Sequence, residues 1–298
     1  MTRRAILALA LSGALAGCIS VEHTEVRPTV PVRAAAGVPA GMQYLYGSGE
    51  GAAISLQAWH ALVRHAGDQV RARPRDSVVL DETATLAAPH FVSCGRKPLA
   101  AVFDVDETVL LNLGFEADDA AHPGRPYDEA RWQDWERTGA AKVQAVPGAR
   151  DGLAALRAMG ITVVFNTNRS ATNAAQTEAA ITGAGIGPAR HGETLFLKGD
   201  DNTGSLKDAR RWRIADRYCV IAMGGDQLGD FSDLFNAGPV GGPAPTTAAR
   251  RTSVAAPAVV AKWGAGWFVL PNPVYGTGLK GGMDEVFPSA MRWTPGTQ

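Results

Sequence analysis

The sequence lacks an excess of charge of either sign, because 29 lysine and arginine residues balance 29 aspartate and glutamate residues. Proteins that bind nucleic-acid polymers through bulk charge carry a basic surplus. We therefore expect no nucleic-acid partner, and any anion must be recognised by a local site. Cysteine is scarce, at 3 residues, and the 6 histidines show no metal-ligand spacing. This shortage argues against zinc and leaves oxygen atoms as the ligands for any metal.

Long hydrophobic runs are missing beyond the N-terminus, so we expect no membrane-spanning helix in the rest of the chain. The first residues have the pattern of a secretory signal: Arg3 and Arg4, a short apolar run, and small residues before Cys18. Residues 15–18 (LAGC) resemble the lipobox of bacterial lipoproteins, in which the cysteine is acylated. An ordinary signal with an incidental cysteine is the alternative. We predict a signal peptide at residues 1–17 and lipidation at Cys18.

The segment that follows the cysteine predicts a flexible tether. Residues 18–40 contain three prolines and no sustained periodicity. Ile19, where an aspartate would be the inner-membrane signal, agrees with outer-membrane sorting as known for bacterial lipoproteins. We therefore expect an exported protein that is lipid-anchored to the bacterial outer membrane and faces the periplasm or the cell surface.

Beyond residue 40, short apolar runs alternate with amphipathic segments. The runs predict buried strands at residues 98–103, 161–166, 194–197 and 218–223. The segments between them predict helices at residues 147–160, 172–182 and 205–213. Such alternation favours an α/β fold, a doubly wound parallel sheet with helices on both faces. We expect this domain at residues 41–280, followed by a C-terminal tail at residues 281–298.

Three segments fall outside this alternation. The charged, tryptophan-rich residues 113–144 predict a small, mainly helical cap, to which we assign an N-terminal helix at residues 48–66 as well. Residues 238–261, rich in Pro, Gly, Ala and Thr, predict a long surface loop. In the N-terminal helix we expect Ser48 to be the N-cap and a packing face made of Ala52, Leu56, Trp59 and Val63.

Polar side chains follow the ends of the predicted strands. Ligands of such sheets bind at the carboxyl ends of the strands, so these side chains should meet there. The set consists of Asp104, Asp106, Thr167, Asn168, Asp226 and Asp230, together with Lys207 at the start of a helix. A carboxylate can attack phosphorus, a second can move the proton, and a divalent cation with a lysine can offset the charge. The sequence therefore predicts phosphoryl transfer with Mg²⁺, and a cation explains the crowded aspartates.

Several motifs in the right order resemble the haloacid dehalogenase (HAD) superfamily and, more narrowly, the class C acid phosphatase family of bacterial surface lipoproteins. The resemblance covers roughly residues 41–280. The superfamily motifs are DVDET at 104–108, TNR at 167–169, SLK at 205–207 and GDQLGD at 225–230. The narrower match rests on QYLYGSGEGAAISLQA at 43–58, PGAR at 147–150 and LPNPVYG at 270–276.

The resemblance implies a role for each residue that matches a motif. Asp104 corresponds to the nucleophile and Asp106 to the general acid/base. Thr167 and Asn168 correspond to the phosphate-binding turn, and Lys207 to the lysine that stabilises charge. Lys198 lies nearby in the sequence, but the Ser-Leu-Lys context favours Lys207.

The resemblance also implies one Mg²⁺ per active site. Its ligands would be the side chains of Asp104 and Asp226 and the backbone carbonyl of Asp106. Asp230 would orient these groups without binding the metal.

The segment that follows the DVDET motif departs from the family pattern, and this departure concerns the substrate preference. The family often reads D-E-T-V-L-D-N-S-P-Y, whereas residues 111–115 here are LNLGF. Tyr275, within the NPVYG stretch, is the first candidate for stacking on an aromatic leaving group. Trp132 is the second, although a tryptophan on this helix is more typical of packing within the cap.

The two cysteines that remain after lipidation leave two alternatives open. Cys94 precedes the first strand of the sheet and Cys219 begins the last predicted one, and by the resemblance these strands are neighbours. In an oxidising compartment the two residues can form a disulfide. Two separate buried thiols are equally compatible with the sequence.

Taken together, the residues and the resemblance predict a magnesium-dependent acid phosphatase that hydrolyses small phosphomonoesters through an aspartyl-phosphate intermediate. Nucleoside 5′-monophosphates are one candidate substrate class. A dehalogenase of the same superfamily lacks the second aspartate of the motif, so Asp106 argues against that activity. A catalytically silent binding or storage lipoprotein with the same fold is the alternative. The oligomeric state is not predicted.

Overall fold

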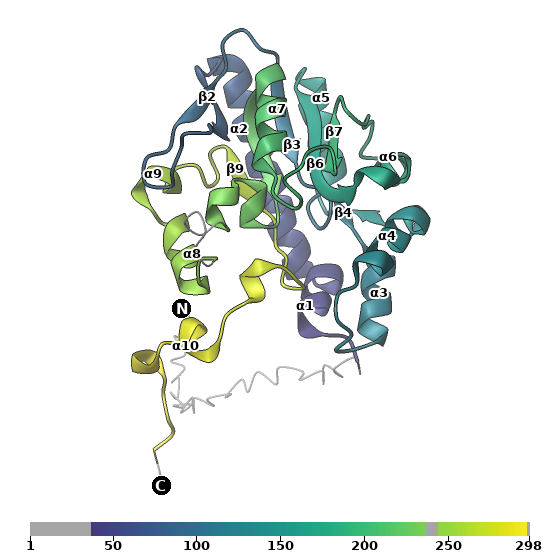
Figure 1. Ribbon diagram of the computed structural model, residues 1–298, viewed down its shortest axis with the longest axis vertical. Helices are drawn as coiled ribbons and strands as arrows, with labels where there is room; N and C mark the ends of the chain where they lie inside the picture. The colour runs from purple at the N-terminus through teal and green to yellow at the C-terminus, as the bar shows by residue number, and fades with distance from the viewer. Residues whose placement is uncertain (1–36, 237–243, 297–298) are drawn as a thin grey trace, which may run out of the picture. The chain divides into compact units, whose positions relative to one another are not determined.

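The computed structural model describes residues 37–236 and 244–296 (Figure 1). The predicted signal peptide, Cys18 and the tether up to residue 36 lie outside the described residues. Within the described ranges, no helix is long and apolar enough to cross a membrane. The described chain begins its regular structure with α1 (Ala40–Met42) and a π-helix at Gln43–Gly47.

A five-stranded parallel sheet forms the centre of the domain, with the strand order β7-β6-β3-β8-β9. In chain order this is third, second, first, fourth, fifth, so the connection reverses direction beside β3, where such sheets bind ligands. The doubly wound parallel fold is confirmed. The strands are β3 (Leu99–Phe103), β6 (Thr162–Ser170), β7 (Leu195–Lys198), β8 (Cys219–Gly225) and β9 (Trp267–Val269).

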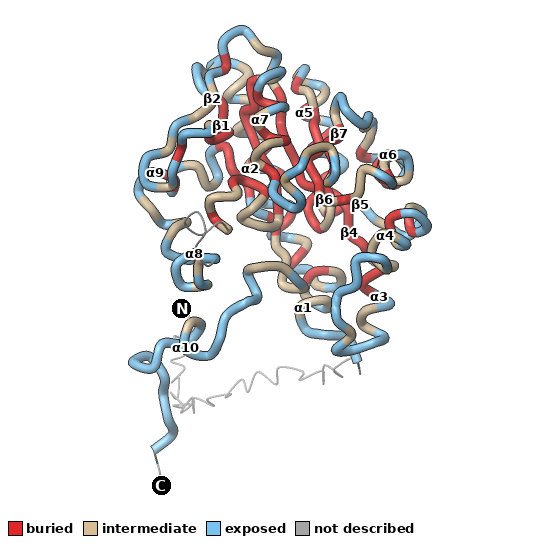
Figure 2. The backbone as a smooth tube through the Cα atoms, in the orientation of Figure 1, coloured by how far each residue is buried: buried red, intermediate tan, exposed pale blue. Residues whose placement is uncertain are grey.

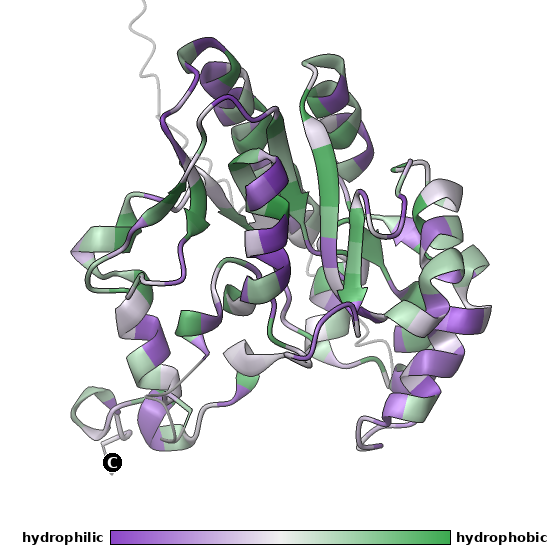
Figure 3. Ribbon diagram, turned by 45° about the horizontal axis from the view of Figure 1, so that its top comes forward, coloured by the Kyte–Doolittle hydropathy of each residue, from purple (hydrophilic) through white to green (hydrophobic). Residues whose placement is uncertain are grey.

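Helices cover both faces of this sheet, as the alternating pattern of β3 shows. Ala101 and Phe103 point into a core shared with α2 (Gly49–Ala72), α5 (Ala149–Ala158) and α6 (Ala174–Gly183). Ala100 and Val102 point into a second core, built with α7 (Asp208–Arg217), α9 (Pro257–Val260) and the pair β1 (Asp76–Leu80) and β2 (Phe91–Ser93). Figure 2 shows the buried residues concentrated along the strands, and Figure 3 shows the apolar strands between helices with hydrophilic outer faces.

The long helix α2 packs through a different face from the predicted one, and it packs in a different place. Ser48 is its N-cap, as expected, and accepts a hydrogen bond from Gly51 N–H at 2.9 Å. The buried stripe, however, consists of Gly51, Ser55, Trp59, Leu62 and Ala66, and Leu56 is exposed. Small residues define this stripe because they allow close contact: a Cβ on Gly51 would lie 2.4 Å from the carbonyl oxygen of Tyr44.

Trp59 fixes where α2 packs. Its ring stacks on that of Phe103 in β3, with 5.1 Å between the ring centroids. On the other side, a Cβ on Gly152 of α5 would lie only 2.4 Å from the Trp59 ring, so α5 approaches closely through a glycine. Helix α2 thus lies against the sheet, and its assignment to the cap is corrected.

The cap itself is mainly helical. It consists of α3 (Leu113–Ala121) and α4 (Glu129–Thr138), flanked by the short antiparallel pair β4 (Leu110–Leu111) and β5 (Gln144–Ala145). Inside the cap, Phe115 packs edge-on against Trp132, with 4.9 Å between the centroids. Glu136, buried on α4, accepts hydrogen bonds from Ser170 N–H at 3.1 Å and Asn173 Nδ2 at 2.9 Å. These bonds tie the cap to the end of β6.

Several elements were not predicted. The expected surface loop at residues 238–261 contains α8 (Thr247–Val254) and α9, and this expectation is wrong for its described part. Thr246 caps α8 by accepting from Ala249 N–H at 3.1 Å. The short strands β1, β2 and β9 also escaped notice. The tail contains α10 (Met283–Val286) and is exposed along most of its length.

A disulfide joins Cys94 to Cys219, which decides between the two alternatives left by the sequence. The bond connects the turn after β2 to the first residue of β8. Both cysteines are buried, at 1% exposure each. The two-stranded β1–β2 unit is therefore covalently attached to the central sheet.

Candidate active site

The predicted site residues gather at the carboxyl edge of the sheet, where β3, β6 and β8 end. The loop after β3 is anchored to the neighbouring strand, because Asp104 N–H donates to the carbonyl of Gly224 in β8 at 3.0 Å. Strand β6 runs further than predicted and includes Thr167 to Ser170. Its polar end therefore reaches the same edge as Asp104 and Asp106.

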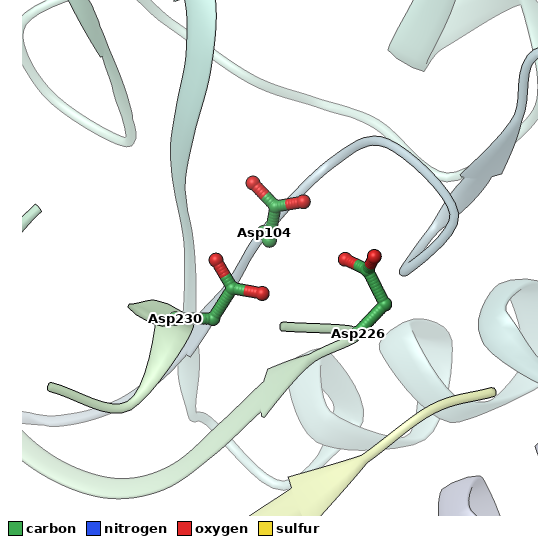
Figure 4. A group of neighbouring side chains, drawn as sticks. All are labelled: Asp104, Asp226 and Asp230. Atoms are coloured by element: carbon green, nitrogen blue, oxygen red, sulfur yellow. The ribbon is translucent and has the colours of Figure 1, made fainter. Parts of the chain in front are cut away.

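Three carboxylates form one buried group at this edge (Figure 4). Asp104, Asp226 and Asp230 each offer an oxygen atom, and these atoms lie within 4.8 Å of one another. Burial, followed by the neighbouring Asp230 and Asp226 carboxylates, raises the pKa of Asp104 well above its usual value, while Lys207 opposes the shift. Burial and Asp230 raise the pKa of Asp226 to about 7. The group therefore holds more negative charge than it can stabilise alone.

Lys207 lies between two of these carboxylates. Its Nζ atom is 2.5 Å from Asp104 Oδ1 and 2.6 Å from Asp230 Oδ1, and both bonds are buried. The lysine is held at the N-cap of α7, where Asp233 accepts its backbone N–H at 2.9 Å. Lys198 lies elsewhere and pairs with Glu129 of the cap at 2.9 Å. The structure thus brings Lys207 to the carboxylates.

Asp230 and Asp226 have different surroundings within the group. The two oxygens of Asp230 accept from Lys207 Nζ and, at 2.9 Å, from Gln227 N–H. Among the described residues, the donors to Asp226 are all neutral groups: Thr108 Oγ1 at 3.1 Å, Gln227 Nε2 at 2.9 Å and Asn272 Nδ2 at 2.7 Å. The charge of Asp230 is balanced by the lysine, whereas the charge of Asp226 is not balanced by a cation among these contacts.

Asp106 stands apart from the three carboxylates. Its Oδ1 atom accepts from Arg169 Nε at 2.9 Å, Arg169 Nη2 at 2.7 Å and Asn112 Nδ2 at 2.9 Å. Its Oδ2 atom accepts no hydrogen bond from the described residues. Arg169 is buried, with 1% of its side chain exposed, while 13% of the Asp106 side chain is exposed. One oxygen of Asp106 is thus fixed and the other is left for a further partner.

The two residues predicted to bind phosphate lie at the end of β6. Thr167 is fully buried, and its Oγ1 accepts from Arg169 N–H at 3.2 Å. The side-chain amide of Asn168 is already occupied: it donates to Ser205 O at 3.0 Å and accepts from Arg210 Nη2 at 2.7 Å. The side chain of Asn168 therefore holds the segment before α7.

The carboxylate group fits a divalent cation of the hard-oxygen class. Its oxygens are close enough to share one ion, and burial, followed by the neighbouring carboxylates, raises the pKa of Asp104 and Asp226, which a cation would offset. A bound divalent cation would neutralise these carboxylates and the negative charge of a phosphate beside them.

The two aromatic candidates for substrate stacking lie in different settings. The Tyr275 side chain is 37% exposed, yet its hydroxyl donates to the buried carboxylate of Glu107. Trp132, half-buried in the cap, packs on Phe115 and faces the guanidinium of Arg169, which lies 5.8 Å from the ring centroid. Both rings are therefore linked to the Asp106 region through one intervening residue.

Sequence reasoning missed four polar residues that hold this site together: Glu107, Asn112, Arg169 and Asn272. Glu107, Arg169 and Asn272 lie within the quoted motifs, and this membership was the available signal, but none of the three received a role. Asn112 accepts from Arg169 Nη2 at 2.8 Å and from Trp135 Nε1 at 3.0 Å. It coincides with the asparagine of the family pattern D-E-T-V-L-D-N-S-P-Y, although the residues on either side of it differ.

Comparison with known proteins agrees with this geometry. The family model of the HAD superfamily, subfamily IIIB (acid phosphatase), matches residues 55–278. The chain belongs to this family. It is an acid phosphatase of the HAD superfamily and thus a phosphomonoesterase, which confirms the predicted activity at this level. A comparison with curated proteins gave no match.

Two solved structures share the fold of this acid phosphatase. Both are of the class C acid phosphatase from Bacillus anthracis, one of them with tungstate bound. The tungstate-bound structure is 23% identical to this chain and has a TM-score of 0.61. The match covers 80% of this chain and 84% of the chain in that structure. The other is 22% identical with the same coverage and a TM-score of 0.62. The predicted fold is therefore confirmed.

Proposed function

We propose that this acid phosphatase is Mg²⁺-dependent and hydrolyses its substrates through a phosphorylated Asp104. Asp104 would attack phosphorus, the ester bond would break, and the leaving oxygen would take a proton from Asp106. Asp106 would then accept a proton from water, and the resulting hydroxide would attack the aspartyl phosphate to release inorganic phosphate and free Asp104. The main support is the position of Lys207, bonded to both Asp104 and Asp230.

The hydrogen bonds of Asp106 support its role in proton transfer. Three donor atoms from Arg169 and Asn112 hold Oδ1, so the carboxyl group cannot rotate freely. A proton would therefore be carried on Oδ2, which has no partner among the described residues. The general acid would thus present a single oxygen in a fixed direction, which is what positioned proton transfer requires.

The metal would be held by the side chains of Asp104 and Asp226 and by the backbone carbonyl of Asp106. It would supply positive charge that lowers the repulsion between the phosphate and the attacking carboxylate. Asp230 would keep Lys207 in place, because its own oxygens are taken by Lys207 and the Gln227 N–H. Thr167 and the backbone N–H of Asn168 would contact the phosphate.

Nucleoside 5′-monophosphates are the substrate class that we propose. The phosphate site is built from residues at strand ends and would accept many monoesters, so discrimination must arise at the leaving group. Tyr275 presents a partly exposed ring beside this site, and Trp132 lies on the cap side. An aromatic base stacked on such a ring gains favourable free energy that glycerol phosphate cannot gain.

We further propose that the protein is exported and held at the outer membrane by acylation of Cys18, facing the periplasm or the cell surface. The sequence pattern before Cys18 supports this location. The disulfide between Cys94 and Cys219 agrees with an oxidising compartment.

Hydrolysis of a chromogenic phosphomonoester tests the proposal. Activity should require Mg²⁺, disappear with EDTA and return when Mg²⁺ is added in excess. A catalytically silent binding protein would instead bind inorganic phosphate without turnover. Activity that EDTA leaves unchanged would contradict the metal assignment, and no activity under any condition would contradict the function.

A further inference from the structure

Glu107 follows Asp106 directly, and the reaction described above assigns it no task. Its side chain is buried, with 1% exposure, and its backbone φ of +54° lies in the left-handed region. Residues other than glycine rarely adopt this conformation, and they keep it where the surrounding structure holds them in place. The position of Glu107 is therefore imposed by its contacts.

Those contacts come from three separate parts of the chain. Oε1 of Glu107 accepts from Tyr46 Oη at 3.2 Å, in the N-terminal π-helix, and from Asn112 N–H at 3.0 Å, at the start of the cap. The side-chain amide of Asn112 lies 3.2 Å from each carboxylate oxygen. Oε2 also accepts from the hydroxyl of Tyr275, in the C-terminal segment. Glu107 thus joins the loop of Asp104 and Asp106 to the rim of the site.

Tyr275 is fixed at its backbone as well as at its hydroxyl. Its N–H donates to Asn272 Oδ1 at 3.2 Å, and its carbonyl accepts from Gln227 Nε2 at 3.3 Å. Asn272 and Gln227 both donate to Asp226, at 2.7 and 2.9 Å. One end of Tyr275 is therefore held by the Asp226 region and the other by Glu107, with the partly exposed ring between them.

We propose that Glu107 is a positioning residue that fixes the ring of Tyr275 and thereby sets the preference for phosphomonoesters with an aromatic leaving group. A tyrosine ring at a partly exposed rim has several accessible rotamers, and a hydrogen bond from its hydroxyl to a buried carboxylate selects one of them. A ring that is already ordered loses less entropy when a base stacks on it. This inference rests on the proposed function, in which Tyr275 provides the stacking surface.

Glu107→Gln tests the idea without changing the size of the side chain. Asn112 donates to both carboxylate oxygens, and a tyrosine hydroxyl donates to each as well. Either orientation of the new amide therefore places its NH₂ group against the Nδ2 donor of Asn112, and the tyrosine hydroxyl beside that NH₂ group can bond only by accepting. Tyr275→Phe removes the same bond from the other side while it keeps the ring.

The readout is kcat/KM for a nucleoside 5′-monophosphate divided by kcat/KM for glycerol phosphate. Each variant should lower this ratio about tenfold, as expected for the loss of a buried hydrogen bond, and mainly through a higher KM for the nucleotide. The double variant should lose no more selectivity than the more affected single variant, because both changes break the same bond. Tyr46→Phe, which removes a bond to the other side of the carboxylate, is the matched control and should keep a ratio close to that of the wild type.

Three results would overturn the inference. The first is a Glu107→Gln variant that keeps the wild-type ratio. The second is a double variant in which the effects of Glu107→Gln and Tyr275→Phe add. The third is a Glu107→Gln variant that lowers kcat equally for both substrates, which would mean that Glu107 only supports the loop of Asp104. Tyr275→Ala separates these results from failure of the stacking assignment. If that variant keeps the wild-type ratio, Tyr275 is not the platform and the inference fails with it. A wild-type enzyme that hydrolyses neither ester would contradict the proposed function itself.

Discussion

Arg169 donates from Nε and Nη2 to a single carboxylate oxygen of Asp106, at 2.9 and 2.7 Å. The guanidinium is buried, so this contact is strong and its geometry is well defined. The cap adds to the arrangement, because Asn112 bonds to both residues. Arg169 therefore determines how Asp106 faces the rest of the site.

Asp106→Asn provides the first prediction. The amide oxygen can replace Oδ1 and accept from Arg169 and Asn112, while its NH₂ group takes the place of the free Oδ2. The geometry should therefore survive and only proton transfer should be lost, with activity falling on the order of 10²–10⁴-fold. Rapid-quench assays with a labelled phosphomonoester should trap phosphoenzyme in this variant. Steady-state activity close to that of the wild type would exclude Asp106 as the general acid/base.

Asp104→Asn should abolish turnover and leave the fold intact. The amide is nearly isosteric with the carboxylate but cannot attack phosphorus, and it removes one charge from a crowded buried group. We expect no phosphoenzyme in the presence of Mg²⁺ and, measured without added metal, a thermal midpoint no lower than that of the wild type. Asp134→Asn, on an exposed part of α4, is the matched control and should retain full activity. Labelled phosphate on the Asp104→Asn protein would place the nucleophile elsewhere.

Cys18→Ser tests the predicted anchor. Without a thiol to acylate, the protein should move from the membrane fraction to the soluble periplasmic fraction or accumulate as an unprocessed precursor. Cell fractionation followed by immunoblotting measures this directly. Fully processed protein that stays in the membrane fraction would show that another segment holds it there.

The extent to which the sequence predicts this molecule depends on how local each signal is. Strands such as β3 and β8 are predictable, because each is a short apolar run buried on both faces and followed by polar motif residues. The predicted packing face of α2 was wrong by one position, because hydrophobic periodicity alone favoured Leu56 over the small residues Gly51 and Ser55. Their importance lies in the close contact that they permit, which depends on the neighbouring backbone.

The same distinction applies to the site. Asp104, Asp226 and Lys207 stand in recognisable motifs, and the resemblance to a family places them together. The contacts of Glu107 join residues 46, 112 and 275, which lie far apart in the sequence and carry no shared pattern. Likewise, the occupied side chain of Asn168 depends on Ser205 and Arg210, which only the folded chain brings near.

The disulfide should contribute strongly to stability. Cys94 and Cys219 are 125 residues apart, and in the chain-entropy model closing a loop of this length stabilises the folded state by about 4–5 kcal/mol. The Cys94→Ser/Cys219→Ser variant should therefore unfold at a markedly lower denaturant concentration than the oxidised wild type. The test uses the double variant because both cysteines are buried and a reductant reaches them poorly. Equal midpoints would mean that packing alone holds β2 to β8.

Glu116, on α3 of the cap, makes stability depend on pH. Its side chain is buried. Burial, followed by the charge of Asp119, raises its pKa to about 7, although Arg131 opposes the shift. In the unfolded chain the carboxyl group ionises near its ordinary value, about 4.3. Between these two values the folded protein retains a proton that the unfolded chain releases, so the free energy of unfolding decreases as the pH rises through this window.

Glu116→Gln should remove this contribution, because an amide does not titrate. The free energy of unfolding is measured for both proteins by denaturant unfolding. From about pH 4.5 to pH 8, the wild type should lose on the order of 3 kcal/mol of stability relative to the variant. The change with pH is the relevant quantity, since it cancels any constant cost of burying the amide. Above pH 7 both states of the wild type are ionised and the difference should become constant. A difference that does not change with pH would show that the Glu116 carboxyl group has no raised pKa in the folded protein.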